Sequence, residues 1–438
     1  MFLVDRLRGM QDVLPPESDF YSKIELLMRS CAEFYGFSLI RTPVLEFTEL
    51  FNRSAGDSSD IVQKEMYTFN DKSGRSVTLR PEFTAGVLRA IVNGLSGSVV
   101  YPLKIMYFGP CYRYERPQTG RYREFYQFGV EIFGAPSVLA DLELICLAND
   151  IFNKLELKNV NLEINAIGCA SCRQNYLDAV KNFFASIKDD LCETCKLRLS
   201  TNPLRIFDCK NLECKKLFDN APHTVDFICN NCLSEFENLK RFLEINKIRY
   251  IVNTRIVRGL DYYTKFVFEF VVNFDGSDLT ICGGGRYDNL SASLGGPDLP
   301  ATGFGIGFER IVKLLQKTNN SIKINKKNKV YIVYMCENAK FVAVDIVSKL
   351  RSLGIQCDFD VVGRSVKSQM KYANKIGYDF VAVIGENELK KNNINLKNMS
   401  SGTEISFNLN NFHSDVYNYF KKNCDNSGLD ISNSWPFK

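Results

Sequence analysis

The chain has 438 residues, which is too long for one compact core and predicts two or three domains. Apolar residues make up 45% and charged residues 24%, as in ordinary globular proteins, and the net charge of +5 permits an anionic partner without demanding one. The N-terminus lacks the apolar core of a secretory signal, and no segment approaches the ~20 apolar residues of a membrane span. We therefore expect a cytoplasmic protein that does not bind membranes.

The numbers of histidines and cysteines limit the kinds of reaction and metal site that the chain could have. The chain has only two histidines, His223 and His413, and neither lies in a motif described below. Mechanisms that need a catalytic histidine, such as the common hydrolase triads, are therefore disfavoured. Fifteen cysteines are present, and eight of them fall between Cys169 and Cys232. Without an export signal, this density favours metal ligation over a disulfide framework.

Helical and strand-like patterns alternate along the first part of the chain and return after residue 250. Apolar spacing and turn residues predict helices and hairpins. Hairpins with appended helices favour an α+β fold with a mixed, mainly antiparallel sheet over a doubly wound one. The expected helices are 17–35, 138–155 and 307–315, and the expected strands are 38–46, 66–70, 76–79, 104–114, 124–133, 266–272 and 279–282.

The pattern divides the chain into domains. Residues 1–167 and 250–320 form the expected main domain, and the helical, lysine-rich and cysteine-rich segment 168–249 interrupts it as an insertion. A polar linker, 321–328, leads into residues 329–438, where strands and helices alternate as in a small α/β domain. The strands expected there are 330–334, 356–361 and 380–384, and the helices are 339–353 and 366–376.

The expected hairpin 104–133 carries many polar side chains. On its first strand Arg113 and Glu115 would share a face, and on its second strand Gln127 and Glu131 would share a face. Two facing strands could thus present an arginine and several acceptors to one pocket, and arginines in the intervening loop suit phosphates. The alternative is a charged, exposed hairpin without a ligand, because charge on strands is usually solvated. Spacing alone leaves both interpretations open.

A second polar region lies at 255–290. It places an arginine, a glycine, an acid and two tyrosines ahead of an apolar strand, and this is followed by the segment Cys282-Gly-Gly-Gly-Arg-Tyr-Asp288. A turn that offers a cation and phenols beside a strand suits a small-molecule site. The two segments resemble the histidine-specific signatures of histidyl-tRNA synthetases. Two long matches in the right order are much more specific than a lone glycine-rich pattern.

Other segments resemble the general motifs of class II aminoacyl-tRNA synthetases. Residues 41–43 with the preceding helix resemble motif 1, the dimer element, and residues 108–131 resemble motif 2. Residues 303–310 resemble motif 3, although a strand-to-helix turn alone would also need small residues. Residues 79–85 resemble the amino-acid loop of the histidyl family. The resemblance covers nearly the whole chain and implies a class IIa homodimer with a C-terminal anticodon-binding domain.

The resemblance implies an activity and its cofactor. ATP and L-histidine would give histidyl-adenylate and pyrophosphate, and histidine would pass to the 3′ end of tRNA(His). The attacking carboxylate is ionised near neutral pH, so no general base is needed, and catalysis reduces to positioning and charge stabilisation. Arginines and Mg²⁺ bound with ATP can supply this stabilisation. The implied catalytic and ATP-binding residues are Arg113, Glu115, Arg258 and Arg310, of which Glu115 would lie near the adenine.

The resemblance also assigns the two other substrates. Glu82, Thr84 and Gln127 would hold the α-amino group of histidine. Glu131 and Tyr263 would recognise the two imidazole nitrogens, with Tyr262 beside them. Phe83 departs from the family, which often has glycine there, and is expected to tighten the amino-acid loop. The tRNA acceptor end would meet the hairpin-loop residues Arg116, Gln118 and Arg123.

The clustered cysteines form four closely spaced pairs. Eight thiolates would fill two tetrahedral zinc sites, and paired spacing is what such sites use. The alternative is a set of reduced, partly buried thiols. Members of the resembled family manage without these cysteines, so structural zinc stays a hypothesis and is no general catalytic requirement. The pairs are Cys169 with Cys172, Cys192 with Cys195, Cys209 with Cys214, and Cys229 with Cys232.

Two other functions compete with this interpretation. A regulatory paralogue that partners ATP phosphoribosyltransferase would share the catalytic fold, but it should lose parts of the ATP and tRNA motifs and the C-terminal domain. Here Arg113, Arg258, Arg310, Gln118 and that domain are all present. A pure RNA-binding module would not need the amino-acid pocket. We therefore expect an active histidine–tRNA ligase.

Overall fold

The computed structural model describes residues 4–56, 59, 61–94, 100–116, 120–209, 211–256, 262–318 and 328–423. The chain forms two compact units, Met1–Ile322 and Lys323–Lys438. Two residues expected at the site, Gln118 and Arg258, lie outside the described residues. Among the helices that are described, none combines the length and apolar character needed to cross a membrane.

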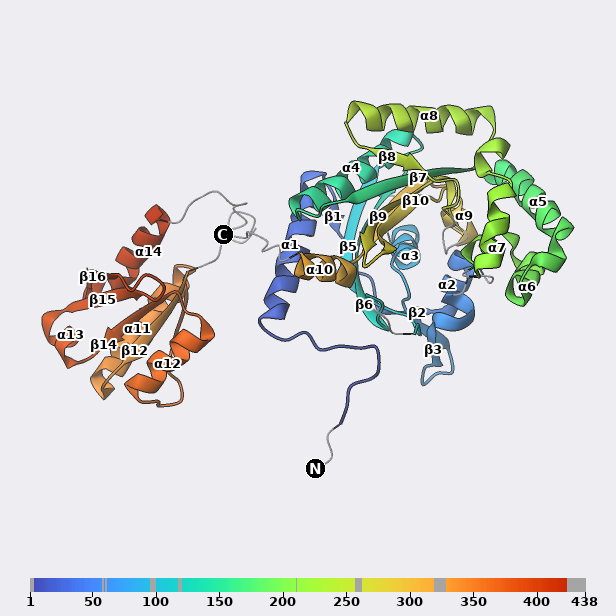
Figure 1. The fold of residues 1–438 in the computed structure, drawn as a ribbon. Helices are drawn as coiled ribbons and strands as arrows, with labels where there is room; N and C mark the ends of the chain where they lie inside the picture. The colour runs from blue at the N-terminus through green and yellow to red at the C-terminus, as the bar shows by residue number, and fades with distance from the viewer. Residues whose placement is uncertain are drawn as a thin grey trace. The chain divides into compact units, whose positions relative to one another are not determined.

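An eight-stranded sheet forms the centre of the first unit (Figure 1). Its five inner pairings are antiparallel, and the outermost pairing on each side is parallel. The prediction of a mixed, mainly antiparallel sheet is confirmed. Across the sheet the strands are β1 (Ser38–Leu39), β5 (Leu103–Tyr112), β6 (Glu124–Phe133), β11 (Ala301–Gly307), β10 (Ser277–Arg286), β9 (Thr264–Phe274), β7 (Val160–Gly168) and β8 (Tyr250–Val252).

The two faces of this sheet are covered by different helices. Side chains alternate between the faces along each strand, so Phe128, Val130 and Ile132 of β6 enter the larger apolar core. The helices over that core are α1 (Glu17–Phe34), α4 (Val138–Lys154), α8 (Asn230–Ile245) and α10 (Phe308–Lys317). The opposite face packs against α3 (Thr84–Gly94) and α9 (Leu290–Ser293). That face also carries the polar residues of the candidate site.

A small three-stranded sheet lies beside α3. Its order is β2 (Leu45–Phe47), β4 (Ser76–Leu79), β3 (Tyr67–Asn70), and α2 (Thr48–Ala55) and a π-helical turn (Ile61–Glu65) accompany it. The expected strand 38–46 is therefore wrong, because the chain forms two short strands in two sheets. Between them the Arg80 guanidinium donates to the carbonyl oxygens of Thr42 at 3.0 Å and Pro43 at 3.3 Å. At Thr42 and Pro43, hydrogen bonds from the Arg80 side chain take the place of pairing with a neighbouring strand.

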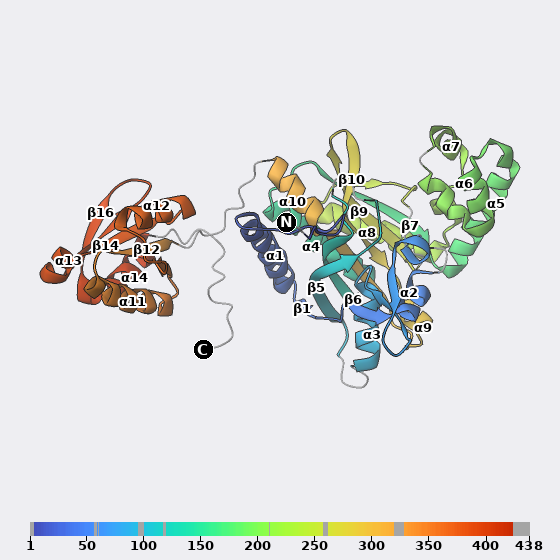
Figure 2. The same ribbon diagram turned by 90° about the horizontal axis from the view of Figure 1, so that it is seen from below.

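The segment between β7 and β8 is helical, as predicted. In Figure 2 its first helices form a group of their own beside the large sheet, whereas α8 packs back onto the main core. This group has a small core around Phe184, Leu199 and Phe218. Besides α8 its elements are α5 (Ala170–Ser186), α6 (Glu193–Thr201), α7 (Leu212–Leu217) and 3₁₀ turns at Lys188–Asp190, Pro203–Asp208, Phe218–Asn220 and Thr224–Phe227.

The second unit is a five-stranded sheet with helices. Strand β12 pairs in parallel with β13 and β14, and antiparallel β15 and β16 extend the sheet. Its apolar core lies between the sheet, α11 and α14. The elements are β12 (Lys329–Tyr334), α11 (Glu337–Ser352), β13 (Gln356–Phe359), α12 (Val366–Ile376), β14 (Phe380–Ile384), α13 (Glu386–Lys391), β15 (Asn393–Asn398), β16 (Glu404–Asn408), a 3₁₀ turn (Leu409–Asn411) and α14 (Phe412–Asn423).

Candidate active site

Glycines on β11 make room for polar side chains of the neighbouring strand β6. The pairing sets Gly303 opposite Glu131, Gly305 opposite Gly129 and Gly307 opposite Gln127. A Cβ atom on Gly303 would lie 1.5 Å from Glu131 Oε2, and one on Gly305 would lie 2.1 Å from Gln127 Nε2. The bare backbone therefore lets both side chains lie across β11, on one face as predicted.

Glu131 is the centre of a buried hydrogen-bond network. Its Oε1 accepts from Thr84 Oγ1 at 2.8 Å and from the Tyr107 hydroxyl at 3.1 Å, and its Oε2 accepts from the Tyr287 hydroxyl. Burial raises the pKa of Glu131 to about 8, although these three donors oppose the rise. The carboxyl therefore changes charge near neutral pH, as a group that senses a substrate proton can.

A second buried carboxylate, Glu82, caps the start of α3. It accepts from the backbone N–H of Thr84 at 2.5 Å and of Ala85 at 3.0 Å. Burial raises its pKa, while these bonds and then nearby Arg113 act to lower it. A helix N-terminus favours a negative charge, which suits a buried acid at this position.

Three tyrosine rings enclose these carboxyl groups. The ring of Tyr262 lies 4.8 Å from that of Tyr263 and 5.4 Å from that of Tyr287, measured between centroids. Burial raises the pKa of Tyr262 well above its ordinary value, and its neighbours Tyr263, Glu82 and Glu131 raise it further. The structure thus brings the expected histidine-site residues Glu82, Thr84, Glu131, Tyr262 and Tyr263 together, with Gln127 on the same face of β6 as Glu131.

Phe83, which departs from the resembled family, fixes the start of α3. Its ring stacks on Tyr107, with centroids 4.4 Å apart, and the Arg80 guanidinium lies 3.8 Å from its centroid. Phe83 is only 2% exposed. The expected tightening of the loop therefore has a physical basis in two aromatic contacts.

An arginine-lined cavity of about 370 Å³ extends from Gln127 along the sheet. Its volume lies within the usual range of small-molecule sites. Three guanidinium groups, those of Arg113, Arg121 and Arg310, line it. Burial, together with the charges of Arg121 and Arg113, lowers the pKa of Arg310 to about 10. Although carboxylates also line the cavity, three guanidinium groups in one cavity suit a ligand that carries several negative charges.

Backbone carbonyls hold two of these arginines in place. Arg113 Nε donates to Pro81 O at 2.9 Å, and Arg310 Nη1 donates to Thr280 O. Arg113 Nη1 lies 4.0 Å from a carboxylate oxygen of Glu115, which also lines the cavity. Both arginines are therefore positioned before any ligand binds.

The expected placement of Arg113 and Glu115 on a strand is wrong. Strand β5 ends at Tyr112 instead of residue 114. The Arg113 N–H still donates to Arg123 O at 2.9 Å, but the Tyr114 N–H turns to Glu65 O at 2.7 Å. The chain leaves the ladder there because the π-helical turn offers another acceptor, and both side chains nevertheless reach the cavity.

Two of the residues expected at the tRNA acceptor end, Arg116 and Arg123, lie at the rim of this hairpin. Arg116 is exposed. The Arg123 guanidinium stacks 3.8 Å from the Tyr114 ring centroid and donates to Glu115 O at 3.3 Å. Arg121, which we noted only as a loop arginine, instead enters the cavity and pairs with Glu115 at 3.3 Å.

Several residues of the site were not predicted from sequence. Tyr107 and Tyr287 bind Glu131, and Glu269 and Glu309 line the cavity. Glu309 is 5% exposed, and burial raises its pKa to about 7. Tyr287 and Glu309 both lie inside segments that resemble family signatures, so those signatures were the available signal.

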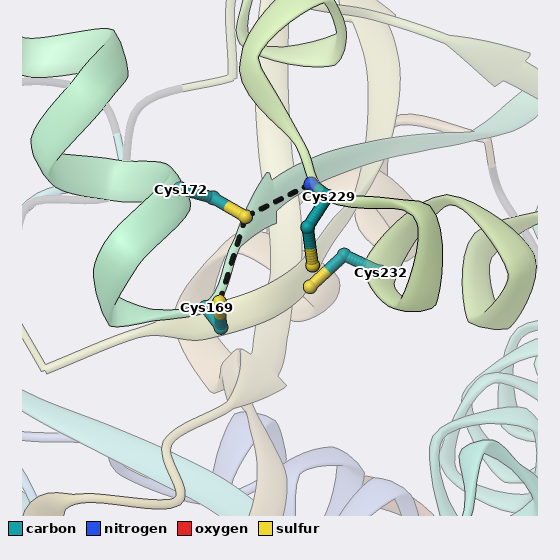
Figure 3. A group of neighbouring side chains, drawn as sticks. All are labelled: Cys169, Cys172, Cys229 and Cys232. Atoms are coloured by element: carbon teal, nitrogen blue, oxygen red, sulfur yellow. Dashed lines mark hydrogen bonds between the residues drawn. The ribbon is translucent and has the colours of Figure 1, made fainter.

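The eight clustered cysteines form two separate groups. Within each group the four sulfur atoms all lie within 4.8 Å of one another. Sequence spacing did not tell which pairs would combine. One group contains Cys169, Cys172, Cys229 and Cys232 (Figure 3), and the other contains Cys192, Cys195, Cys209 and Cys214.

Comparison with known proteins agrees with this geometry. A family model described as histidyl-tRNA synthetase matches residues 9–172 and 220–311, more than half of the chain, and one described as an anticodon binding domain matches 329–418. The histidine–tRNA ligase of Caldanaerobacter subterraneus subsp. tengcongensis is 47% identical over 91% of this chain and 95% of its own length. That of Clostridium novyi is 45% identical over 92% and 96%.

Solved structures give the same result. The apo histidyl-tRNA synthetase of S. aureus is 35% identical with a TM-score of 0.81, and the match covers 95% of this chain and all of the other. A Bacillus halodurans C structure, described as an ATP phosphoribosyltransferase regulatory subunit/histidyl-tRNA synthetase, has a TM-score of 0.63 at 23% identity, covers 88% and 98%, and shows the fold alone. Because the family model matches more than half of the chain and relatives 45–47% identical match nine tenths of it, this chain belongs to the histidyl-tRNA synthetase family.

Proposed function

We propose that the chain activates L-histidine with ATP and transfers it to the 3′ end of tRNA(His). The single observation that carries this proposal is the continuity of two sites along β6. Glu131 lies in a buried pocket of carboxyl and phenol groups, and Gln127, four residues away, lines the arginine cavity. An amino acid in the first pocket and a triphosphate in the second would bring carboxylate and α-phosphate together.

Histidine occupies the buried pocket in this proposal. Glu82, Thr84 and Gln127 hold the α-amino group, while Glu131 and Tyr263 bind the two imidazole nitrogens beside Tyr262. A carboxylate and a phenol can satisfy a ring that carries one N–H donor and one acceptor nitrogen. An amino acid with an apolar side chain would offer no N–H donor to the buried Glu131 and would set apolar groups against its carboxylate, which is a basis for rejection.

ATP, bound as its Mg²⁺ complex, occupies the arginine cavity. Arg113 binds the α-phosphate, Arg310 clamps the phosphates and Glu115 lies near the adenine. Arg258, which is outside the described residues, approaches the α-phosphate from the other side. The histidine carboxylate attacks the α-phosphorus, the bond to the bridging oxygen breaks and pyrophosphate leaves with that oxygen. Fixed guanidinium groups stabilise the charge that moves in this step.

The remaining parts of the chain are assigned to tRNA and to assembly. Arg116, Gln118 and Arg123 meet the acceptor end, and residues 329–438 bind the anticodon stem after a linker at 321–328. Residues 1–167 and 250–320 form the catalytic domain, interrupted by the insertion 168–249. A homodimer forms through motif 1, since Phe34, Leu39, Leu45 and Phe47 around that segment are exposed apolar side chains.

Pyrophosphate exchange into ATP tests the proposal. Exchange should require histidine and should not occur with the other nineteen amino acids. Exchange that is equally fast with another amino acid, or absent while the protein is folded, would contradict the assignment. The regulatory alternative has less support because ligases are 45–47% identical over nine tenths of the chain, and it predicts no exchange at all.

A further inference from the structure

The two cysteine groups offer sites that the ligase chemistry does not use. In the first group, Cys169 is the N-cap of α5 and Cys172 lies in its first turn, while Cys229 is the N-cap of α8 and Cys232 lies in its first turn. Residues three apart at a helix start lie on one side of the helix. Two helix starts that face each other therefore bring four sulfur atoms to one point, as Figure 3 shows.

The sulfur spacing in this group fits a single metal ion. The Sγ atoms of Cys169 and Cys172 are 3.5 Å apart, and no pair in the group is separated by more than 4.8 Å. A disulfide would need about 2.05 Å. Four sulfurs at about 2.3 Å from a central Zn²⁺ are about 3.8 Å from one another in a tetrahedron. An iron–sulfur cluster holds its cysteines farther apart, since several atoms lie between them.

The surrounding backbone also suits bound thiolates. The Cys229 N–H donates to Cys172 Sγ at 3.0 Å, an outer contact that orients a ligand sulfur. Gly168, which precedes the first ligand, has φ of +73°, and a Cβ atom there would lie 2.4 Å from Cys172 Cβ. Only glycine combines this backbone conformation with the space that the sulfur group needs.

The second group lies inside the insertion and shares part of this arrangement, although Cys209 follows a 3₁₀ turn and Cys214 lies within α7. Cys192 is the N-cap of α6 and Cys195 lies in its first turn. Cys192 Sγ lies 3.8 Å from Cys209 Sγ, the edge expected for a tetrahedral zinc site. Two backbone donors again point at ligand sulfurs: the Cys192 N–H lies 3.3 Å from Cys214 Sγ, and the Asn211 N–H lies 3.4 Å from Cys209 Sγ.

Around this group the insertion is built from short helices and a small apolar core. Helix α6 has nine residues and α7 has six, and isolated helices this short are marginal in water. Three of the cysteines, Cys195, Cys209 and Cys214, are themselves members of the small apolar core. Small cores of this kind commonly depend on a metal or on disulfides.

We propose that residues 169–232 hold two structural zinc ions, one in each four-cysteine group. The first ion fastens the beginning of the insertion to its end, where α5 leaves β7 and α8 returns to the main core. The second ion holds α6 and α7 within the insertion. Neither site touches the arginine cavity, so the proposal stands independently of the ligase function.

Metal analysis of the full chain tests this proposal. Protein from zinc-supplemented cells, passed over a weak chelating resin, should contain two zinc ions per chain by elemental analysis. Cys229→Ser should remove one ion and Cys192→Ser should remove the other. Cys146→Ser changes a cysteine on α4 outside both groups and should leave two. Any other content in the folded wild-type chain, whether none, one, or iron in place of zinc, overturns the proposal.

A second measurement on the wild-type chain avoids variants that fail to fold. An organic mercurial that binds thiols should release two zinc ions per chain, detected with a metal-binding dye. Replacement by Co²⁺ should give the absorption bands of tetrahedral cobalt with thiolate charge transfer, saturating at two ions per chain. Free reaction of all cysteines without zinc release, or cobalt bands of octahedral type, would identify the groups as ordinary thiols.

Discussion

Arg173 Nη1 donates a hydrogen bond of 3.0 Å to the backbone carbonyl oxygen of Tyr263. Arg173 directly follows Cys172 in the first turn of α5, whereas Tyr263 belongs to the proposed histidine pocket. The start of the insertion therefore contacts the backbone that positions a proposed substrate ligand. Strand β7, which leads into the insertion, makes a second contact with the segment ahead of Tyr262. There the Asn165 side chain donates to the carbonyl oxygens of Thr254 at 3.3 Å and Ile256 at 3.4 Å.

The hydrogen bond from Arg173 to Tyr263 predicts that changing Arg173 weakens histidine binding. Arg173→Ala should raise the KM for histidine about five- to tenfold, in line with the roughly 1 kcal/mol of one hydrogen bond, and should change kcat less. Pyrophosphate exchange at varied histidine concentration measures both constants. Gln174→Ala on the same turn is the matched control, because Gln174 donates only to exposed Asp178 among its described contacts. A lower kcat at unchanged KM would contradict a positioning role.

The raised pKa of Glu131 predicts a pH dependence of activity. The carboxylate must be ionised to accept strongly from the imidazole N–H, and burial raises its pKa to about 8. The kcat/KM for histidine should therefore rise with pH and level off above about 8, because this constant reports the free enzyme. The imidazole of free histidine has a pKa near 6.5, well below the pH range of this rise. In Glu131→Gln the rise of kcat/KM with pH should disappear, and kcat/KM should fall about 100-fold.

The same group should lower stability as pH rises. An exposed glutamate in the unfolded chain ionises near its ordinary value of 4.5, whereas folded Glu131 keeps its proton up to about 8. Between these values the unfolded state binds fewer protons, so the contribution of Glu131 to stability falls with increasing pH. Glu131→Gln should show a smaller loss of thermal stability between pH 5 and pH 8. An equal slope in both proteins would count against a buried neutral Glu131.

The surroundings of Gly303 leave no room for a side chain, so we predict that replacing this glycine impairs activity. Its added Cβ would displace Glu131, and a shift of about 1 Å at a substrate ligand can lower the rate about 100-fold. Gly303→Ala should therefore reduce histidine-dependent exchange by at least that factor. Gly94→Ala, at the end of α3, has open space around the new methyl group and should behave as wild type. Equal activity of the two variants would show that Glu131 is not held where we place it.

Much of the fold followed from local patterns, and the corrections have local causes. Strand β6 and helix α12 have their predicted ends because apolar alternation and helical spacing continue to the last residue. Strands β15 and β16 were not predicted, since Asn393-Ile-Asn-Leu-Lys-Asn398 is rich in asparagine, which is typical of loops. Pairing with β14 overrides that preference, and only tertiary structure could show it.

The site was predictable in its residues more than in its contacts. Spacing on β6 predicted that Gln127 and Glu131 share a face, and the structure agrees. The resemblance supplied Glu82 and Thr84, but the hydrogen bond from Thr84 to Glu131 joins residues 47 positions apart, which local patterns do not predict. Sequence separation also hid the grouping of the cysteines, because Cys169 meets Cys229 only after the insertion has folded back.

The second unit, which matches an anticodon-binding domain over residues 329–418, predicts a separation of the two activities. It forms its own apolar core, and the residues that line the arginine cavity and make the Glu131 network belong to the first unit. A chain that ends at residue 322 should therefore keep histidine-dependent pyrophosphate exchange. Its aminoacylation of tRNA(His) should fall sharply, mainly through a higher KM for tRNA.

Salt dependence gives this last prediction a second measurement. Lysines cluster around the junction at positions 323, 326, 327 and 329, and cations that contact phosphates make tRNA affinity fall with ionic strength. The KM of the full chain for tRNA should rise more steeply with salt than that of the truncated chain, while the KM for histidine should respond alike in both. The competing idea is that the unit braces a dimer. If the truncated chain loses both pyrophosphate exchange and dimerisation, the unit braces a dimer. If the truncated chain charges tRNA as well as the full chain does, the unit does not bind the anticodon.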